Sequence, residues 1–237
     1  MTPICAVKTR LILFATLALS VALGAAEPAP DAHQILRKAR EAYTAQQHTL
    51  VGRLRKGDVS LPFELAISGN SLRYEFKKPT QVIQLRLLEK DSRLEEITRG
   101  GTEKISAARF DQRVRDTDIS YEDLALKFLY WPSAAVTGEE TRSLRKCWVI
   151  RVEPGRKDDS QYGSVTLWID QQFGALSQAE ANDPSGKLAR RFKVTKGQKM
   201  DGAWMLKEMR IETLGRETTK DRSPTYLEIE AIAKPTP

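Results

Sequence analysis

Cysteine and histidine are scarce in this 237-residue chain, which has two of each. Cys5 lies near the N-terminus, so one thiol, Cys147, remains beyond the first 26 residues and no internal disulfide can form there. Cys147 lies in the stretch KCWVIRVEP, which is typical of a strand, so we expect a buried, inert thiol rather than a reactive one. The histidines, His33 and His48, belong to no metal-binding motif such as H-E-x-x-H.

Signatures of catalysis and of nucleotide binding are also missing. The chain has no G-x-S-x-G nucleophile elbow and no phosphate loop ending in G-K-[ST]. Strand-like and helix-like segments do not alternate, which argues against a doubly wound nucleotide-binding fold. We therefore expect neither an enzyme nor a bound cofactor.

A long apolar run, LILFATLALSVALGAA, lies near the N-terminus. Lys8 and Arg10 precede it and the small residues Gly24–Ala26 end it, as in a secretory signal peptide. Its 16 residues are few for a membrane span, which needs about 20, although a retained anchor is the alternative. Cys5 precedes the run, so it is not placed to accept a lipid. We expect a signal peptide at residues 1–26 and export to the periplasm.

Residues 27–237 are expected to form a single domain. Within it, residues 31–46 predict a helix, because Asp31 is a good N-cap, Gln34 has the capping-box position, and apolar residues recur with a period of 3.6. From His48 onward the period changes to two, as in strands with one apolar and one polar face.

Alternation of this kind recurs in the segments LPFELAI, SLRYEF and QVIQLRLLEK. Their apolar faces carry Leu61, Phe63, Leu65, Leu72, Tyr74, Phe76, Ile83 and Leu85. In the second half, segments rich in Gly, Pro and Asp separate further strands. We count ten or eleven strands in all, so the fold class is mainly β with covering helices (α+β), built on an antiparallel sheet.

The acidic segment DTDISYEDLALKFLYWP could hold a metal ion or begin a helix. Ser120 and Asp123 have the spacing of a capping box. Glu122 and Asp123 would lie in the first turn, where the helix dipole favours negative charge, and Pro132 follows the end. This pattern favours a capped helix.

Two acids of that segment, Asp116 and Asp118, have no assigned role in such a helix. Neither has a histidine or cysteine nearby, and the spacing of a calcium loop is missing. We therefore expect no metal site. Glu139 and Glu140, in the stretch TGEETRS, are interpreted as solvated residues of a turn.

The charge balance is basic, at +7 for the whole sequence. The positive residues fall in separate short patches, RKGD, EFKK and ARRFK, rather than in one continuous run. We interpret the patches as solvated faces, with weak attraction to anionic lipid head groups as the alternative. Nucleic acid is not an expected partner of an exported chain.

Several segments together resemble the outer-membrane lipoprotein-sorting proteins of the LolA-like superfamily. They are Asp118–Leu124 (DISYEDL), Cys147–Pro154 (CWVIRVEP), Tyr162–Asp170 (YGSVTLWID), GKLARRFKV, the G-x-W turn at Gly202–Trp204 and the stretch Met209–Thr213. The similarity extends over roughly residues 31 to 234, and it rests on the order and spacing of these segments rather than on a catalytic motif.

The resemblance implies a strongly curved, half-open antiparallel β-barrel with helices at its mouth. It also implies a concave apolar cavity that holds the acyl chains of lipids or lipoproteins during lipoprotein sorting. The expected partners are then that cargo and membrane-bound donor and acceptor proteins, with the carrier itself a monomer.

The eight apolar residues of the first three strands are candidates for the cavity wall, because an acyl-chain carrier needs a large apolar concavity. The alternative is that they form a closed core. A second function also stays open, in which the same half-barrel is a periplasmic interaction module, such as a stress sensor that binds a membrane partner.

Overall fold

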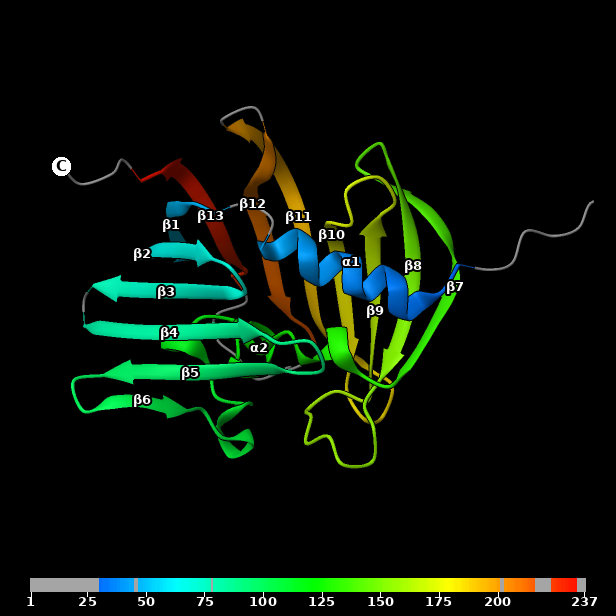
Figure 1. Cartoon of the computed structure of the whole chain (residues 1–237), viewed down its shortest axis with the longest axis horizontal. Coiled ribbons are helices and arrows are strands. Elements are labelled where there is room, and N and C mark those ends of the chain that lie inside the picture. The colour runs from blue at the N-terminus through cyan, green and yellow to red at the C-terminus, as the bar shows by residue number, and fades with distance from the viewer. Residues whose placement is uncertain (1–29, 45–46, 78, 201–202, 216–222, 234–237) are drawn as a thin grey trace, which may run out of the picture.

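The computed structural model describes residues 30–44, 47–77, 79–200, 203–215 and 223–233. These residues form one curved antiparallel sheet whose strand order is β6-β5-β4-β3-β2-β1-β13-β12-β11-β10-β9-β8-β7 (Figure 1). The strands are Thr49–Lys56 (β1), Val59–Ser68 (β2), Ser71–Lys77 (β3), Thr80–Leu87 (β4), Ser92–Thr98 (β5), Gly101–Lys104 (β6), Ser133–Arg142 (β7), Arg145–Glu153 (β8), Ser164–Asp170 (β9), Leu176–Asn182 (β10), Leu188–Met200 (β11), Ala203–Thr213 (β12) and Thr225–Ile232 (β13). The predicted fold class is confirmed, and the sheet has more strands than the ten or eleven expected.

Two meanders make up this sheet, one from β1 to β6 and the other from β7 to β13. They meet along β1 and β13, where Leu54 pairs with Leu227 in an antiparallel register. The strands β6 and β7 lie at the two edges. The predicted turn at Glu139 and Glu140 is wrong, because both residues lie within the edge strand β7, although both are exposed as expected.

The helix α1 (Ala32–Thr44) crosses the concave face of the second meander (Figure 1). The backbone N–H of His33 donates to Oδ1 of Asp31 at 2.9 Å, as predicted for an N-cap. Leu36 and Ala39 face inward and are buried in the cluster that contains Ile150. The apolar stripe read from the sequence is therefore the face that packs on the sheet.

The chain between the two meanders forms the short helix α2 (Tyr121–Ala125) and three 3₁₀ turns, η1 (Ala107–Arg109), η2 (Val114–Asp116) and η3 (Lys127–Tyr130). The predicted SYEDL helix is thus shorter than expected. It stops where Leu126 takes a left-handed conformation with φ of 51°, and the chain continues as η3.

Two buried apolar clusters lie under the sheet. One combines β1–β5 with the segment around α2, and the other combines α1, η3 and β8–β10. Cys147 is fully buried on β8, as predicted, and burial raises the pKa of its thiol.

The expected signal peptide at residues 1–26 lies outside the described residues. Within the part of the chain that the structure covers, none of the helices has the length and hydropathy needed to cross a membrane.

Most of the basic patches form ion pairs on the sheet. Arg55 of RKGD pairs with Glu228 at 2.8 Å, and Lys77 of EFKK pairs with Glu64 at 2.5 Å. Arg190 of ARRFK departs from the expected solvated face, because it is only 5% exposed and donates to a backbone carbonyl. The interpretation as solvated faces is therefore wrong for this arginine.

Candidate functional site

An apolar cavity of about 120 Å³ lies between the concave face of the sheet and its helical cover. The sheet contributes wall residues from β3, β4 and β10–β13, and the cover contributes residues from α1, α2 and η3. The lining consists of Tyr43, Leu72, Tyr74, Leu85, Ile119, Asp123, Leu124, Leu126, Phe128, Leu176, Ala179, Phe192, Leu206, Met209, Ile211 and Leu227. Both meanders therefore build the same site.

Three of the eight residues predicted for the cavity wall, Leu72, Tyr74 and Leu85, line this cavity. The other five lie beside it in the first apolar cluster. They are Leu61, Phe63, Leu65, Phe76 and Ile83. Phe63 is only 2% exposed, and its ring meets that of Tyr74 edge-on at 5.7 Å. The structure thus places Phe63 behind a residue of the wall.

Sequence reasoning missed the contribution of the second meander to the wall. Leu206 and Met209 on β12 and Leu227 on β13 line the cavity opposite the first meander. Their stretches do show strand-like alternation, so an apolar face could have been assigned to each. Which of these faces shares a cavity with β3 depends on the pairing of β1 with β13, and no local pattern encodes that pairing.

Few polar groups reach the cavity. The phenol of Tyr74 has a pKa raised to about 12 by burial. Burial, together with the neighbouring Tyr74, also raises the pKa of Tyr43. Both phenols are therefore neutral at physiological pH. Asp123 uses one carboxylate oxygen to accept from Ser120 N at 2.7 Å and the other to accept from the Tyr162 hydroxyl at 2.6 Å.

The capping box predicted for α2 is present. Ser120 Oγ accepts from Asp123 N at 3.2 Å while the Asp123 carboxylate accepts from Ser120 N. Gln161 also donates its side-chain amide to Ser120 Oγ at 3.0 Å. The first turn of α2 is therefore tied to the loop between β8 and β9.

Glu122 strengthens the same connection. It is 1% exposed, and its carboxylate accepts from the Ser160 hydroxyl and from Gln161 N. Burial raises the pKa of Glu122, and the two hydrogen bonds oppose that rise.

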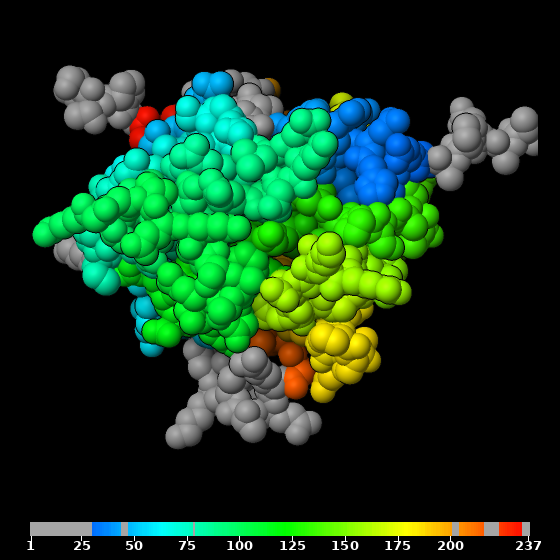
Figure 2. Space-filling model, turned by 60° about the horizontal axis from the view of Figure 1, so that its bottom comes forward, coloured from blue at the N-terminus to red at the C-terminus, as the bar shows by residue number. Residues whose placement is uncertain are grey.

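Seen from below, the chain around α2 and the loop between β8 and β9 meet along a narrow seam (Figure 2). We call this end of the barrel the closed end.

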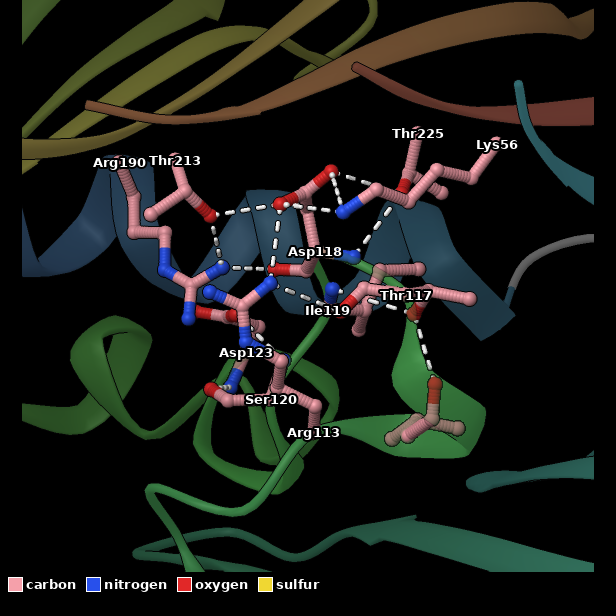
Figure 3. A network of polar contacts seen from close by, with 11 residues as sticks. Lys56, Arg113, Thr117, Asp118, Ile119, Ser120, Asp123, Arg190, Thr213 and Thr225 are labelled. Atoms are coloured by element: carbon pink, nitrogen blue, oxygen red, sulfur yellow. Dashed lines mark hydrogen bonds and ion pairs between the residues drawn. The ribbon is translucent and has the colours of Figure 1, made fainter. Parts of the chain in front are cut away.

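Asp118 is the centre of a buried polar network at the closed end (Figure 3). Its Oδ1 accepts from the Thr213 hydroxyl at 2.8 Å and from Arg113 at 3.1 Å, and its Oδ2 accepts from the Thr225 hydroxyl at 3.0 Å. Lys56 Nζ lies 3.3 Å from Oδ2.

The chain just before α2 is therefore held to three strands of the sheet, namely β1 through Lys56, β12 through Thr213 and β13 through Thr225. Arg190 adds a fourth strand, β11, by donating to the Asp118 carbonyl and to the Thr213 hydroxyl. The view that Asp118 has no structural role is wrong. A buried carboxylate needs such partners, because an unpaired buried charge is very costly.

The same acids do not form a metal site. Across the ranges that the structure describes, no group of three or more histidine, cysteine, aspartate or glutamate side chains is arranged to hold a metal ion. Asp116 is exposed, in contrast to Asp118. What the site offers chemically is a partly enclosed apolar surface.

Comparison with known proteins agrees with this architecture. A protein-family model described as "Uncharacterized protein" matches residues 99–234. None of the curated proteins matches the chain in sequence. Among solved structures, a DUF1329 family protein from Desulfovibrio piger shares 18% identity with a TM-score of 0.64, over 84% of this chain and 90% of that one.

Two other solved structures have similar scores. A putative outer membrane lipoprotein-sorting protein domain from Vibrio parahaemolyticus shares 16% identity with a TM-score of 0.62, over 86% of this chain and 93% of that one. A LolA superfamily protein from Nitrosomonas europaea shares 18% identity with a TM-score of 0.60, over 88% and 96%. At these identities the likeness establishes the fold.

Proposed function

We propose that this chain is a carrier of lipid acyl chains. It belongs to the family, described as "Uncharacterized protein", whose model matches residues 99–234, and it has the fold of the LolA superfamily. In this proposal the chain is exported to the periplasm, binds lipids or lipoproteins in the cavity, and takes part in outer-membrane lipoprotein sorting. One of the proteins with this fold is described as a lipoprotein-sorting domain, which supports the choice of cargo.

The observation that carries the proposal is the partly enclosed apolar cavity between the two meanders and the helical cover. Each methylene group moved from water into such a cavity contributes about 0.8 kcal/mol. The polar atoms of the lining do not oppose this transfer, because the oxygens of Asp123 are already hydrogen-bonded and the phenol of Tyr74 is neutral at physiological pH. The wall is thus suited to an uncharged chain.

The size of the cavity implies that the cover moves when cargo binds. A protein cavity of about 150 Å³ accommodates benzene, so the present 120 Å³ accommodates only a few carbons of an acyl chain. The sheet wall is held by strand pairing and α2 by its buried hydrogen bonds, whereas Tyr43 projects from α1 and Phe128 from η3. We expect these segments to shift and the sheet to stay, since regions with fewer hydrogen-bonded neighbours open at lower free energy.

Displacement of a fluorescent fatty acid tests the proposal. Tyr74→Glu places a carboxylate in the cavity wall and should abolish probe binding while cooperative thermal unfolding persists, because the cavity can admit water. Phe63→Glu buries the same charge in the closed core and should unfold the protein. Arg73→Glu, at an exposed position beside Tyr74, is the matched control and should bind like the wild type.

Mass spectrometry of the gently purified protein gives an independent test. Lipid or lipopeptide that copurifies with the wild type and is lost from Tyr74→Glu would support the carrier. A folded wild type that neither copurifies with lipid nor binds an acyl probe would sink the proposal and leave the interaction module ahead. N-terminal sequencing that finds Met1 retained would contradict the export step.

A further inference from the structure

Three strand pairs of the second meander, β7–β8, β9–β10 and β11–β12, have their joined ends at the same end of the sheet, along the top of Figure 1 and opposite α2. An exposed large apolar side chain lies at each of these ends, namely Leu144 between β7 and β8, Phe173 between β9 and β10, and Trp204 near the start of β12. Only two other large apolar side chains in the described residues are exposed, Val59 and Leu88. We call these three apolar side chains, with the described residues beside them, the rim.

The first turn of the rim holds its leucine in a costly conformation. Ser143 and Leu144 both have positive φ, at 48° and 66°, in a two-residue hairpin turn where Asn and Gly are the usual choices. Leu144 is 99% exposed, so it makes almost no contact that would stabilise the folded chain. Neither backbone geometry nor packing explains a leucine at this position.

The aromatic side chain of the second turn, Phe173, is held in place while it remains exposed. The Arg145 guanidinium lies 4.5 Å from the centroid of the Phe173 ring, and the Asp170 carboxylate accepts from Phe173 N at 2.8 Å. Trp204 is 64% exposed and pairs across the hairpin with Lys199. Fixed orientation reduces the entropy lost when an aromatic side chain binds a partner.

Positive charge accompanies these side chains. Lys146, Lys199 and Lys207 are exposed, and within the described ranges none of them is joined to a carboxylate by an ion pair. Among the acids nearby, Asp170 pairs with Arg145, Glu208 with Lys196 at 2.9 Å and Glu140 with Arg142 at 2.5 Å, while Glu139 on β7 is exposed. The rim therefore presents free ammonium groups beside apolar side chains.

A depression of about 380 Å³ opens between the first two turns. It is lined by Leu144, Arg145, Lys146, Asp170, Gln171 and Gln172. The Asp170 carboxylate in this lining is paired with Arg145, whereas Lys146 is exposed. The ammonium group of Lys146 is therefore placed to pair with an anionic head group.

We propose that the rim is a docking surface for an anionic phospholipid bilayer. The three apolar side chains enter the region between head groups and acyl chains, where tryptophan and lysine are favoured. The lysines and the depression bind phosphate groups. Apolar side chains at three separate strand ends, rather than on one flat patch, suit penetration between lipids better than contact with a second protein surface.

Docking in this orientation places the cavity next to the membrane. Leu176, at the start of β10, lies three residues after Phe173, and Leu206 lies two residues after Trp204 on β12. Leu176 and Leu206 both line the cavity. The opposite end is sealed by the hydrogen bonds of Asp118 and Glu122. The inference goes beyond the acyl-chain carrier proposed above, since bilayer docking and cavity binding are measured separately.

Vesicle flotation tests the docking surface. The full chain should float with vesicles of equimolar phosphatidylglycerol and phosphatidylcholine at low salt, and bind pure phosphatidylcholine far less. The triple variant Leu144→Asn, Phe173→Ser, Trp204→Ser should lose at least about tenfold in vesicle partitioning. The matched control Val59→Ser, Leu88→Ser removes the other two exposed apolar side chains and should bind like the wild type.

Charge is tested separately with the triple variant Lys146→Gln, Lys199→Gln, Lys207→Gln. This variant should bind anionic vesicles less and respond less to salt. Equal vesicle binding by the apolar triple variant and its control would overturn the proposal. So would a rim-dependent dimer in sedimentation analysis without vesicle binding. Each variant is also assayed with the acyl probe, so that loss of docking is distinguished from loss of cavity binding.

Discussion

The two ends of this half-barrel use polar and apolar residues in opposite ways. At the closed end, Asp118, Glu122 and Asp123 are buried, and each carboxylate accepts hydrogen bonds from partners on other elements. At the rim, Leu144 and Trp204 are exposed. The residues that resemble catalytic or metal-binding acids thus hold the chain together, while the surface suited to binding carries no motif.

This contrast separates the residues expected to stabilise the fold, at the closed end, from the residues expected to bind a partner, at the rim. Substitutions at the closed end should lower the free energy of unfolding and affect function only through the fold. Substitutions at the rim should leave stability unchanged or raise it, and should affect binding alone. Each of the following experiments would strengthen or break that division.

The largest effect is expected from Asp118→Asn. Removing the charge leaves Lys56 and Arg113 beside a neutral group in a buried network, and breaking a buried ion pair costs about 3–5 kcal/mol. Urea unfolding measures the loss. The control Asp116→Asn, at an exposed position, should change the free energy of unfolding by less than about 0.5 kcal/mol. Equal effects of the two changes would refute a structural role for the network.

Ser120→Ala should have an intermediate effect. It removes the N-cap of α2 and the acceptor of the Gln161 amide, which costs about 1–2 kcal/mol. Thermal and urea unfolding measure the change. Ser120→Thr, which keeps the hydroxyl, is the conservative control and should retain most of the stability. A neutral Ser120→Ala variant would show that the capping box contributes little to the closed end.

A smaller, pH-dependent effect is expected from Glu122. Its pKa is raised by burial, so the folded state holds the proton more tightly than the unfolded state. This contribution is fully present below the ordinary pKa of 4.5 and is lost as the pH rises through the raised value. The stability of the wild type relative to Glu122→Gln should therefore fall across that window.

Urea unfolding at several pH values measures this relative stability. Glu103→Gln, at an exposed position on β6, should show no such trend relative to the wild type. A difference between wild type and Glu122→Gln that does not change with pH would show that Glu122 keeps its ordinary proton affinity in the fold.

The smallest effect, with the opposite sign, is expected at the rim. Leu144→Asn suits the left-handed backbone and should raise the free energy of unfolding by up to about 1 kcal/mol. Vesicle flotation should weaken in the same variant. A loss of stability instead would mean that the exposed leucine contributes to the fold.

Local patterns predicted much of this fold. The N-cap at Asp31, the capping box of Ser120 and Asp123, and the alternation in β2–β4 each depend on residues within one element, and each is confirmed. The role of Asp118 could not be predicted in the same way. Its partners Thr213 and Thr225 lie 95 and 107 residues away, and only the folded sheet brings them together.

The cavity shows the same limit. Alternation identified Leu72, Tyr74 and Leu85 as members of an apolar face, and it identified Phe63 equally well. Whether such a residue faces a cavity or a packed cluster depends on the depth of the opposing side chains, which belong to the other meander. The wall was therefore predictable as a set of strands, but not residue by residue.

The seam between the two meanders has a consequence for the order of folding. β1 cannot complete its pairing until β13, the last strand, is available. The ion pair between Arg53 and Glu228, which joins these two strands, connects residues 175 positions apart. Closing so long a loop is slow, whereas hairpins within each meander close quickly. A chain that folds from its N-terminus would expose the edge of β1 until the last strand, β13, arrived. An exposed strand edge favours aggregation, so shielding of β1 during that interval should speed folding more than shielding of either meander alone.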